Sequence, residues 1–331
     1  MGHTTMIKLI LIQILLLMIS SRIAVGEERF IEKRISVITN FSEKDAIAKI
    51  LLKKFSDTLN GDAPKDMVIK YDYYWSEGSP ETAKIHAKKI VSSKPDVIFA
   101  ATTPVVRALL QETKTIPIVF ATVADPVGSG FVESLAIPGK NVTGFVNSEG
   151  TIAGKWVQFL KELVPEMSCV SMIYNPNTAP YYKYYVGPFN ETSKSLNVLP
   201  ILSPVLSDQE IENLIYSLSE NKCGLVLMND SFNFVYRQKI NTISEKYGVP
   251  VAAYNKATTL NEALVAYGPE ESDAYKNAAK YVKKIIDGAQ VNKLPVQLNT
   301  KFYLSINLQK AKKLGIKIPA SFLSRVDDEV E

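Results

Sequence analysis

Polar residues that could bind a small charged molecule follow two apolar, β-type runs in this sequence. Thr102 and Thr103 follow the run 96–101, and Asp230 comes shortly after the run 225–228. Free backbone N–H groups at the start of a helix, together with threonine hydroxyls, favour a carboxylate or another anion. A carboxylate at the end of a strand suits an ammonium group. The residues therefore predict a site for a molecule that carries both charges.

Each of these residues also has a structural interpretation. Thr103 precedes Pro104, and this pair is typical of a helix start that threonine caps. Asp230 can cap the helix that follows it in the same way. Asp125 competes for the ammonium group, but an Asp-Pro pair such as Asp125-Pro126 is typical of a turn. We expect the anion at the helix start, with Pro104 part of the site, and the amine at Asp230.

Further candidates stand at the ends of other predicted strands. Asn40 follows the run 34–39 and can reach a ligand, while Phe41 either stacks on a ring or packs in the core. Asn147 lies at the predicted connection between two halves of the chain, where it can touch both ligand and hinge.

Strand ends in the second half supply amides and tyrosines. Residues 175–178 contain amide side chains that can donate and accept hydrogen bonds, or can form an Asx turn. Tyr254 and Tyr267 stand at the ends of two more predicted strands. Each either lines a pocket or packs in the core. The predicted ligand-binding residues are Asn40, Phe41, Thr102, Thr103, Pro104, Asn147, Asn175, Asn177, Thr178, Asp230, Tyr254 and Tyr267.

The elements that must position these residues alternate between strands and helices. Strands are predicted at 34–39, 67–74, 96–101, 116–121, 170–174, 198–202, 225–228, 251–254 and 263–267. Wholly apolar strands separated by amphipathic helices are typical of parallel sheets covered on both faces. The pattern restarts near 144–150, which predicts two α/β lobes in series, each flavodoxin-like or Rossmann-like. Because ligands bind at the carboxyl ends of such strands, a cleft between the lobes is expected, with hinge closure.

Composition and missing motifs exclude several classes of function. The chain has 331 residues and a net charge of +4, which is too balanced for a dedicated nucleic-acid binder. Two histidines, His3 and His86, and two cysteines exclude a His- or Cys-rich metal site. The sequence contains neither GxGxxG after a strand nor GxxxxGK[ST], and no nucleophile–base pair. We therefore expect a binding protein without cofactor or metal, and not an enzyme on this scaffold.

Residues 1–26 have the three-part plan of a secretory signal peptide. Lys8 precedes the apolar run 9–19, and Ala24 and Gly26 supply small residues before a cleavage site. Eleven helical residues span about 16 Å, too short for a bilayer core. The alternative is an uncleaved membrane anchor. We expect cleavage, export to the periplasm and, since no cysteine lies near the cut, no lipid anchor.

The two cysteines occupy equivalent places in the second half. Cys169 precedes Asn175 by the same number of residues as Cys223 precedes Asn229. In a flavodoxin-like strand order their strands are neighbours, about 4.8 Å apart. Export permits oxidation, so we expect a disulfide between Cys169 and Cys223, with two buried thiols as the alternative.

Three stretches of the chain carry a resemblance to a known family. They are residues 102–104 with IPIVFATVADPVGSG at 116–130, PGKNVTGF at 138–145, and the tail 294–319, which contains TKFYLSINLQKAKKLGIKIP. These stretches resemble ABC-transporter substrate-binding proteins of the tryptophan/tyrosine-binding type. The similarity extends from residue 35 to the C-terminus.

The resemblance implies a type I periplasmic-binding-protein fold with three crossings between the lobes. On that plan the N-terminal lobe comprises 27–147 plus 270–292, and the C-terminal lobe 148–269 plus 293–331. The implied function is capture of a small amino-acid-like, apolar or aromatic ligand by a monomer. The implied partner is a membrane permease with a cytoplasmic ATPase. The alternative is a sensory binding protein that docks on a membrane signalling receptor.

Overall fold

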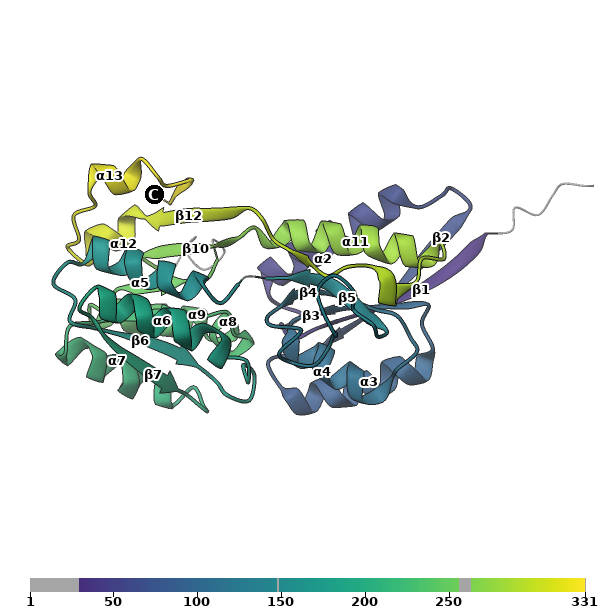
Figure 1. The fold of residues 1–331 in the computed structure, drawn as a ribbon, viewed down its shortest axis with the longest axis horizontal. Coiled ribbons are helices and arrows are strands. Elements are labelled where there is room, and N and C mark those ends of the chain that lie inside the picture. Colours follow the sequence, from purple (N-terminus) through teal and green to yellow (C-terminus); the bar gives the residue numbers. More distant parts are fainter. Residues whose placement is uncertain (1–29, 148, 256–262, 331) are drawn as a thin grey trace, which may run out of the picture. The chain divides into compact units, whose positions relative to one another are not determined.

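Two β-sheets organise the chain in the computed structural model, which describes residues 30–147, 149–255 and 263–330 (Figure 1). The signal peptide expected at 1–26 lies outside these ranges. Residues 30–32 and 64–68 belong to a small separate unit, in which Ile31 N donates to Asp66 O over 2.8 Å. Both lobes' helices and the candidate site belong to the larger unit, which starts at Lys33.

The first sheet has the strand order β11-β5-β4-β3-β1-β2. Its strands are β1 (Ile31–Thr39), β2 (Met67–Trp75), β3 (Val97–Ala101), β4 (Ile118–Val123), β5 (Val142–Val146) and β11 (Gln297–Leu298). The pairs β1–β3, β3–β4, β4–β5 and β5–β11 are parallel. Parallel pairing brings the carboxyl ends of these strands to one edge, which is where the polar candidates begin.

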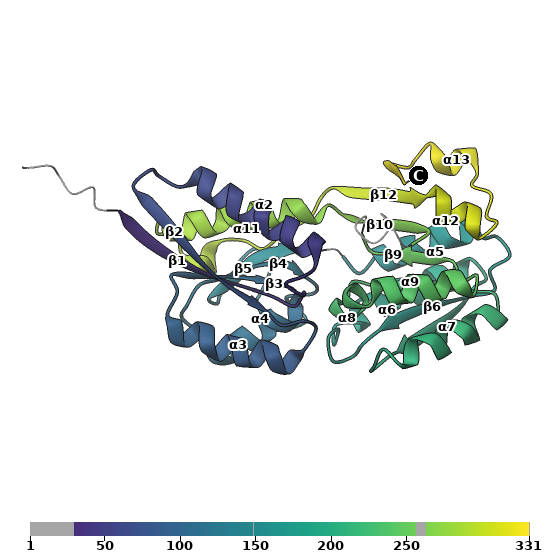
Figure 2. The same cartoon turned by 180° about the vertical axis from the view of Figure 1, so that it is seen from behind.

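Helices cover both faces of the first sheet (Figures 1 and 2). They are α2 (Ala46–Asp62) and α11 (Glu271–Ile286) on one face, with α3 (Pro80–Ser93) and α4 (Thr103–Glu112) on the other. On the α2 and α11 face, the buried rings of Phe55 and Phe99 stack with centroids 4.1 Å apart, and Tyr275 of α11 meets Phe99 edge-on. Aromatic burial of this kind anchors α11 to the sheet although it comes from a distant part of the sequence.

The second sheet has the strand order β13-β12-β10-β9-β8-β6-β7. Its strands are β6 (Cys169–Tyr174), β7 (Leu199–Pro204), β8 (Cys223–Leu227), β9 (Val251–Ala253), β10 (Val265–Pro269), β12 (Phe302–Asn307) and β13 (Asp328–Val330). All described pairs are parallel except β10 with β12, which is antiparallel. The sheet is thus parallel through its centre, as the apolar runs predict, and its two strands at one edge, β12 and β13, run in the opposite direction.

Helices also cover the second sheet on both faces (Figure 1). They are α5 (Ile152–Leu163) and α6 (Lys183–Ser195) on one face, and α7 (Glu210–Glu220) and α9 (Arg237–Lys246) on the other. Shorter helices are α8 (Ser231–Val235), α12 (Leu308–Lys313) and α13 (Ala320–Leu323). Trp156 of α5 is fully buried, and its Nε1 donates to the backbone oxygen of Tyr267 over 2.8 Å. Within the described ranges, no helix is both long and apolar enough to cross a bilayer.

The chain passes between the sheets three times. It leaves the first sheet after β5, returns with α11 and leaves again after β11. Gln297 and Leu298 pair with Phe145 and Val146 of β5, so the segment 293–298 stays with the first sheet. The family resemblance implied that this segment belongs to the second lobe, and the two exposed residues of β11 carry no apolar pattern that would have marked a strand there.

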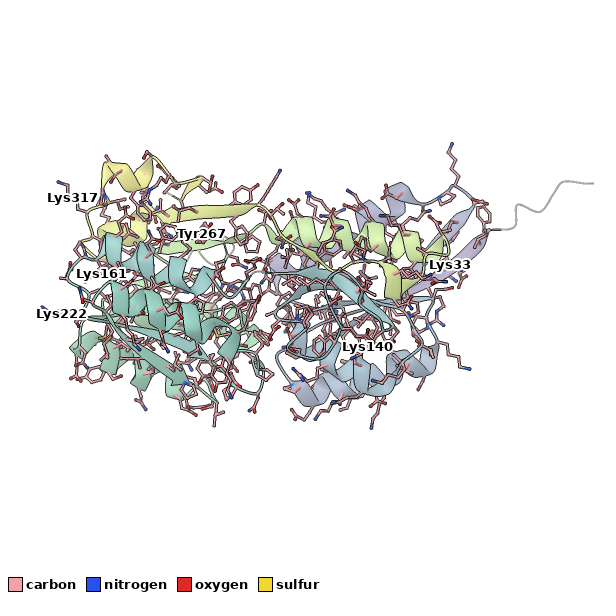
Figure 3. All side chains as sticks on the ribbon, viewed as in Figure 1. Lys33, Lys140, Lys161, Lys222, Tyr267 and Lys317 are labelled. Atoms are coloured by element: carbon pink, nitrogen blue, oxygen red, sulfur yellow. A yellow bond between two sulfur atoms is a disulfide. The ribbon has the colours of Figure 1, made fainter. Side chains whose placement is uncertain are left out.

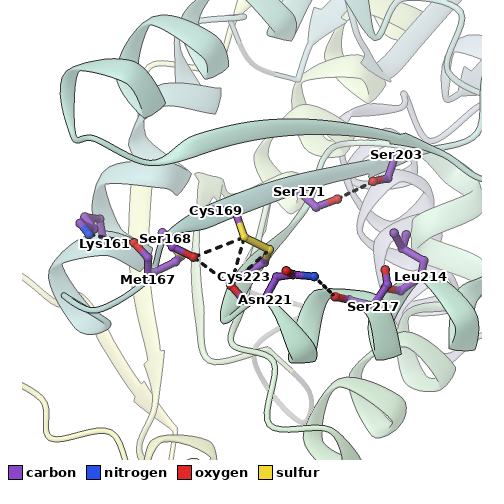
Figure 4. Close-up of a disulfide and its surroundings, with 10 residues drawn as sticks. All are labelled: Lys161, Met167, Ser168, Cys169, Ser171, Ser203, Leu214, Ser217, Asn221 and Cys223. Carbon is purple, nitrogen blue, oxygen red and sulfur yellow. Dashed lines mark hydrogen bonds between the residues drawn. A yellow bond between two sulfur atoms is a disulfide. The ribbon is translucent and has the colours of Figure 1, made fainter.

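Cys169 and Cys223 face each other in the register of β6 and β8. Their Cα atoms are 4.5 Å apart, and the two sulfurs form a disulfide (Figure 4). Ser171 on β6 shares a buried hydrogen bond of 2.7 Å with Ser203 on β7. These links tie three neighbouring strands together at the side-chain level.

Candidate functional site

Polar side chains gather at the carboxyl edge of the first sheet. Asn40 follows β1, Thr102 follows β3 and Asn147 follows β5, and each is at least nine-tenths buried. Both amide atoms of Asn40 and Asn147 and the hydroxyl of Thr102 have no hydrogen-bond partner in the described part of the chain. Because buried polar groups in folded proteins are nearly always paired, this edge has unused capacity to bind a polar ligand.

Thr102 also has an unusual backbone. Its φ of 88° and ψ of 153° lie in a region that essentially only glycine adopts. Its hydroxyl does not cap α4, whereas the Thr103 hydroxyl accepts a hydrogen bond from Ala124 N over 3.2 Å. Strain of this kind costs about 1–3 kcal/mol and clusters at functional sites. Because the Thr102 hydroxyl makes no hydrogen bond to α4, the structure does not support a capping role for this side chain.

A small cavity borders this edge. Its lining comes from Phe41, Thr102, Thr122, Tyr181, Asn229, Ser231, Phe234, Tyr254 and Glu271. The Phe41 and Phe234 rings contact each other with centroids 4.5 Å apart, and the Tyr181 hydroxyl donates to the backbone oxygen of Asn229 over 2.9 Å. The volume is about 10 Å³, enough for about one water molecule. A larger ligand therefore needs these walls to separate.

Among the lining residues, Glu271 is the acid. It is the first residue of α11, two residues after the end of β10, and is 6% exposed. Burial raises the pKa of Glu271 to about 7, although hydrogen bonds with Asn255 and Tyr254 act in the opposite direction. The sequence does not single out Glu271, because acids are common in the first turn of a helix, where they interact favourably with the helix dipole. Its place at a strand end was the available signal.

Asp230 has another role than the one predicted. Asn175 N donates to its Oδ2 over 2.8 Å, while the Thr178 hydroxyl and Phe232 N donate to its Oδ1 over 2.5 and 3.0 Å. Burial raises the pKa of Asp230 to about 6 against these hydrogen bonds. Asp230 caps α8 and is not among the residues that line the cavity. Its carboxylate is occupied by protein donors, so the structure favours the capping interpretation.

The turn at 175–178 also lies outside the cavity lining. Asn177 N donates to Asn175 Oδ1 over 2.9 Å, which is the Asx turn that was the alternative. Asn175, Asn177 and Thr178 line a separate surface groove of about 320 Å³ instead. The rest of its lining includes apolar side chains, which are Pro80, Leu206, Phe232, Val235 and Tyr236.

Of the remaining candidates, one lines the cavity and two pack elsewhere in the structure. Tyr254 lines the cavity at the end of β9. Tyr267, labelled in Figure 3, packs with its ring stacked on Phe302 at 5.7 Å and is not in the lining. Pro104 is buried in the first turn of α4 and is likewise not in the lining. Tyr181 and Phe234 were missed, because they lie outside strand ends.

The described residues offer no metal centre. No group of three His, Cys, Asp or Glu side chains in these ranges is placed to hold a metal ion. His86 contacts the backbone oxygen of Trp75 through Nε2 at 3.2 Å, and its ring packs on Tyr74.

The chain resembles proteins of one family over most of its length. The sequence pattern of the family described as ABC transporter substrate binding protein matches residues 34–330. A tyrosine-binding protein from Clostridioides difficile (strain R20291) is 26% identical over 249 residues, which cover 75% of this chain and 71% of that protein.

Solved structures share the fold. An ABC domain in complex with L-Trp from Streptococcus pneumonia has a TM-score of 0.82 at 22% identity, and covers 90% of this chain and 100% of that one. A conserved domain protein from Vibrio cholerae has a TM-score of 0.81 at 24% identity, with 90% and 99% covered. The predicted α/β fold of type I periplasmic binding proteins is confirmed. The chain belongs to the family of ABC transporter substrate-binding proteins.

Proposed function

We propose that this chain is the extracytoplasmic substrate-binding protein of an ABC importer and that it captures an aromatic amino acid. The observation that carries the proposal is the cavity, in which Phe41, Phe234, Tyr181 and Tyr254 form aromatic walls beside polar groups. Aromatic walls suit a ring, because paired rings add about 0.5–1.5 kcal/mol beyond burial. The tyrosine-binding relative and the structural neighbour with L-Trp point to the same ligand class.

Capture requires movement, because the cavity of about 10 Å³ is far too small for an amino acid. The walls come from elements of both sheets, which are joined by three chain crossings. We infer that the lobes separate to admit the ligand and close on it, leaving its covalent structure unchanged. The first lobe then comprises 27–147 with 270–298, and the second comprises 148–269 with 299–331.

The bound monomer then delivers its ligand to a membrane permease driven by a cytoplasmic ATPase. Export through a cleaved segment 1–26 would place the protein outside the cytoplasm, where such permeases collect substrate. No feature of the described residues favours the sensory alternative.

A thermal-shift screen tests the ligand class. The purified chain is heated with each of the twenty common L-amino acids and with a set of sugars. A ligand at 100 times its Kd adds about 2.7 kcal/mol to the free energy of unfolding. We expect clear shifts with tryptophan, tyrosine or phenylalanine. Shifts with sugars alone, or with none of these compounds, would contradict the proposal.

A further inference from the structure

We propose that Glu271 binds the ammonium group of the ligand, and that the ligand carboxylate lies toward Thr102 and the start of α4. This inference rests on the proposed function and assigns an orientation to the ligand within that site. It also replaces Asp230, whose carboxylate is held by three protein donors.

The composition of the cavity wall supports this role for Glu271. Its nine lining residues include one acid and no lysine, arginine or histidine. Glu271 is 6% exposed, so a ligand amine that reaches it exchanges water for a carboxylate at low dielectric. A neutral amide or hydroxyl elsewhere in the wall cannot balance a full positive charge as well.

The anionic end of the ligand has its own position. Thr102 lines the cavity, is 8% exposed and has an unpartnered hydroxyl. It directly precedes α4, whose ten residues direct free N–H groups and the positive end of the helix dipole to this edge. A buried unpaired donor and a helix start together suit a carboxylate. The ligand carboxylate would thus lie at Thr102 and the start of α4, and its ammonium group at Glu271, within one cavity.

Two polar and two charged groups act on the carboxylate of Glu271. Tyr254 and Asn255 hydrogen-bond to it, Glu270 repels its charge, and Arg237 attracts it. The guanidinium of Arg237 also forms an ion pair with Asp45, with Nη2 and Oδ2 2.9 Å apart. Arg237 is therefore shared, and it is not among the lining residues of the cavity.

A proton should accompany the ligand. Burial raises the pKa of Glu271 to about 7, so part of the ligand-free protein carries a protonated Glu271 at neutral pH. An ammonium at hydrogen-bond distance favours the carboxylate and lowers that pKa. Binding at pH 7 should therefore release protons from the wild-type protein into the buffer.

Calorimetric titration of the full chain with three related probes tests the assignment. L-tryptophan carries both charges, indole-3-propionate lacks the amine and tryptamine lacks the carboxylate. The test variant is Glu271→Gln, which keeps the size of the side chain and removes its charge. The matched control is Glu270→Gln, a neighbouring acid that caps α11 through Ser272 N and does not line the cavity.

We expect Glu271→Gln to weaken L-tryptophan about 10- to 150-fold, the range for losing a hydrogen bond between charged groups. The same variant should change indole-3-propionate by less than about 3-fold, and Glu270→Gln should change either ligand by less than that. Titrations of wild type in two buffers of different ionisation enthalpy should show proton release at pH 7. Glu271→Gln should show none.

Other outcomes separate this inference from the proposed function. Equal weakening of L-tryptophan and indole-3-propionate, or no weakening of either, would overturn the role of Glu271 while the receptor function stands. If wild type binds tryptamine or another amine but no aromatic amino acid, and Glu271→Gln abolishes that binding, the proposed ligand fails and Glu271 stands. If no compound with an amine binds to wild type, both proposals fail.

Discussion

Arg237 and Asp45 form an ion pair with Nη2 and Oδ2 2.9 Å apart, and each side chain is 11% exposed. Asp45 is the N-cap of α2 beside the first sheet, and Arg237 opens α9 beside the second. The Arg237 guanidinium also lies over the Phe234 ring at 4.2 Å, and Phe234 contacts Phe41. A continuous line of contacts therefore connects the ion pair with the aromatic wall of the cavity.

Breaking this ion pair should weaken ligand binding. Asp45→Asn retains a good N-cap for α2 but removes the charge. Truncating one partner of a buried charge pair costs about 2–5 kcal/mol, so we expect L-tryptophan affinity to fall at least about tenfold. The control is Asp57→Asn, an exposed acid later in α2 that pairs with Lys53. Unchanged affinity in Asp45→Asn, measured by calorimetry, would show that the pair does not contribute to ligand capture.

The aromatic wall should set the preference for rings. Phe41→Leu keeps an apolar side chain at the cavity but removes its ring. Since aromatic pairs add about 0.5–1.5 kcal/mol beyond burial, the affinity for L-tryptophan should fall roughly 2- to 10-fold relative to that for L-leucine. Competition binding with both amino acids measures this ratio directly. An equal loss for both ligands would mean that Phe41 acts only by filling space.

The strained backbone of Thr102 predicts that a glycine at this position makes the protein more stable but weakens ligand binding. Thr102→Gly relieves a φ of 88° that glycine adopts freely, so the ligand-free protein should gain about 0.5–2 kcal/mol in unfolding free energy. The same variant loses the hydroxyl proposed for the ligand carboxylate and should bind L-tryptophan more weakly. Thr103→Gly is the control and should lose stability, because its hydroxyl bonds to Ala124 N. Urea unfolding measures both; a destabilised Thr102→Gly would refute the idea of strain.

Stability of the ligand-free protein should fall as pH rises from about 4 to about 7. Burial raises the pKa of Glu271 to about 7 and that of Asp230 to about 6, above the values of 4.5 and 3.8 for exposed groups. The folded state then binds more protons than the unfolded state in this window, so stability decreases with pH. Partly exposed acids in ion pairs, such as Glu245, have lowered pKa values and act below this window.

Urea unfolding at pH 5 and pH 8 checks this slope. Wild type and Glu270→Gln should both lose stability between the two values, and Glu271→Gln should lose less. A stability that increases toward pH 8 in wild type would contradict the burial of these two acids.

The disulfide should stabilise the second lobe. Cys169 and Cys223 are 54 residues apart, and closing a loop of this length contributes about 4 kcal/mol in the chain-entropy treatment. Reduction with dithiothreitol should lower the urea midpoint of wild type. The variant with both cysteines changed to alanine should show no response to the reductant. A wild-type urea midpoint that is the same with and without dithiothreitol would contradict a stabilising role of the disulfide.

Several cavity residues could be predicted from the sequence, because the carboxyl ends of parallel strands lie at the same edge of a sheet. Thr102, Phe41 and Tyr254 follow strands β3, β1 and β9, and all three line the cavity. Asp230 shows the limit of this reasoning: an acid after a strand has the same local pattern whether it caps a helix or faces a ligand. The hydrogen bonds that Asn175 N and the Thr178 hydroxyl donate to Asp230 decide in favour of the structural role, and they depend on the tertiary fold.

Residues outside strand ends were beyond prediction. Phe234 belongs to α8, a helix of five residues that no periodicity marks, and Tyr181 precedes α6. Their contribution depends on how the two sheets' elements meet at Phe41, which is a tertiary relationship. The short strand β11 escaped notice for a related reason, since its pairing with β5 is set by backbone hydrogen bonds and not by apolar side chains.

A crystal structure of the full chain grown with L-tryptophan tests the central claim most directly. We expect the intact amino acid in the cavity, with its ring among Phe41, Phe234 and Tyr181 and its amine at hydrogen-bond distance from Glu271. L-tryptophan bound instead in the surface groove beside Asn175, or a saturated crystal with this cavity still closed and empty of ligand, would contradict it.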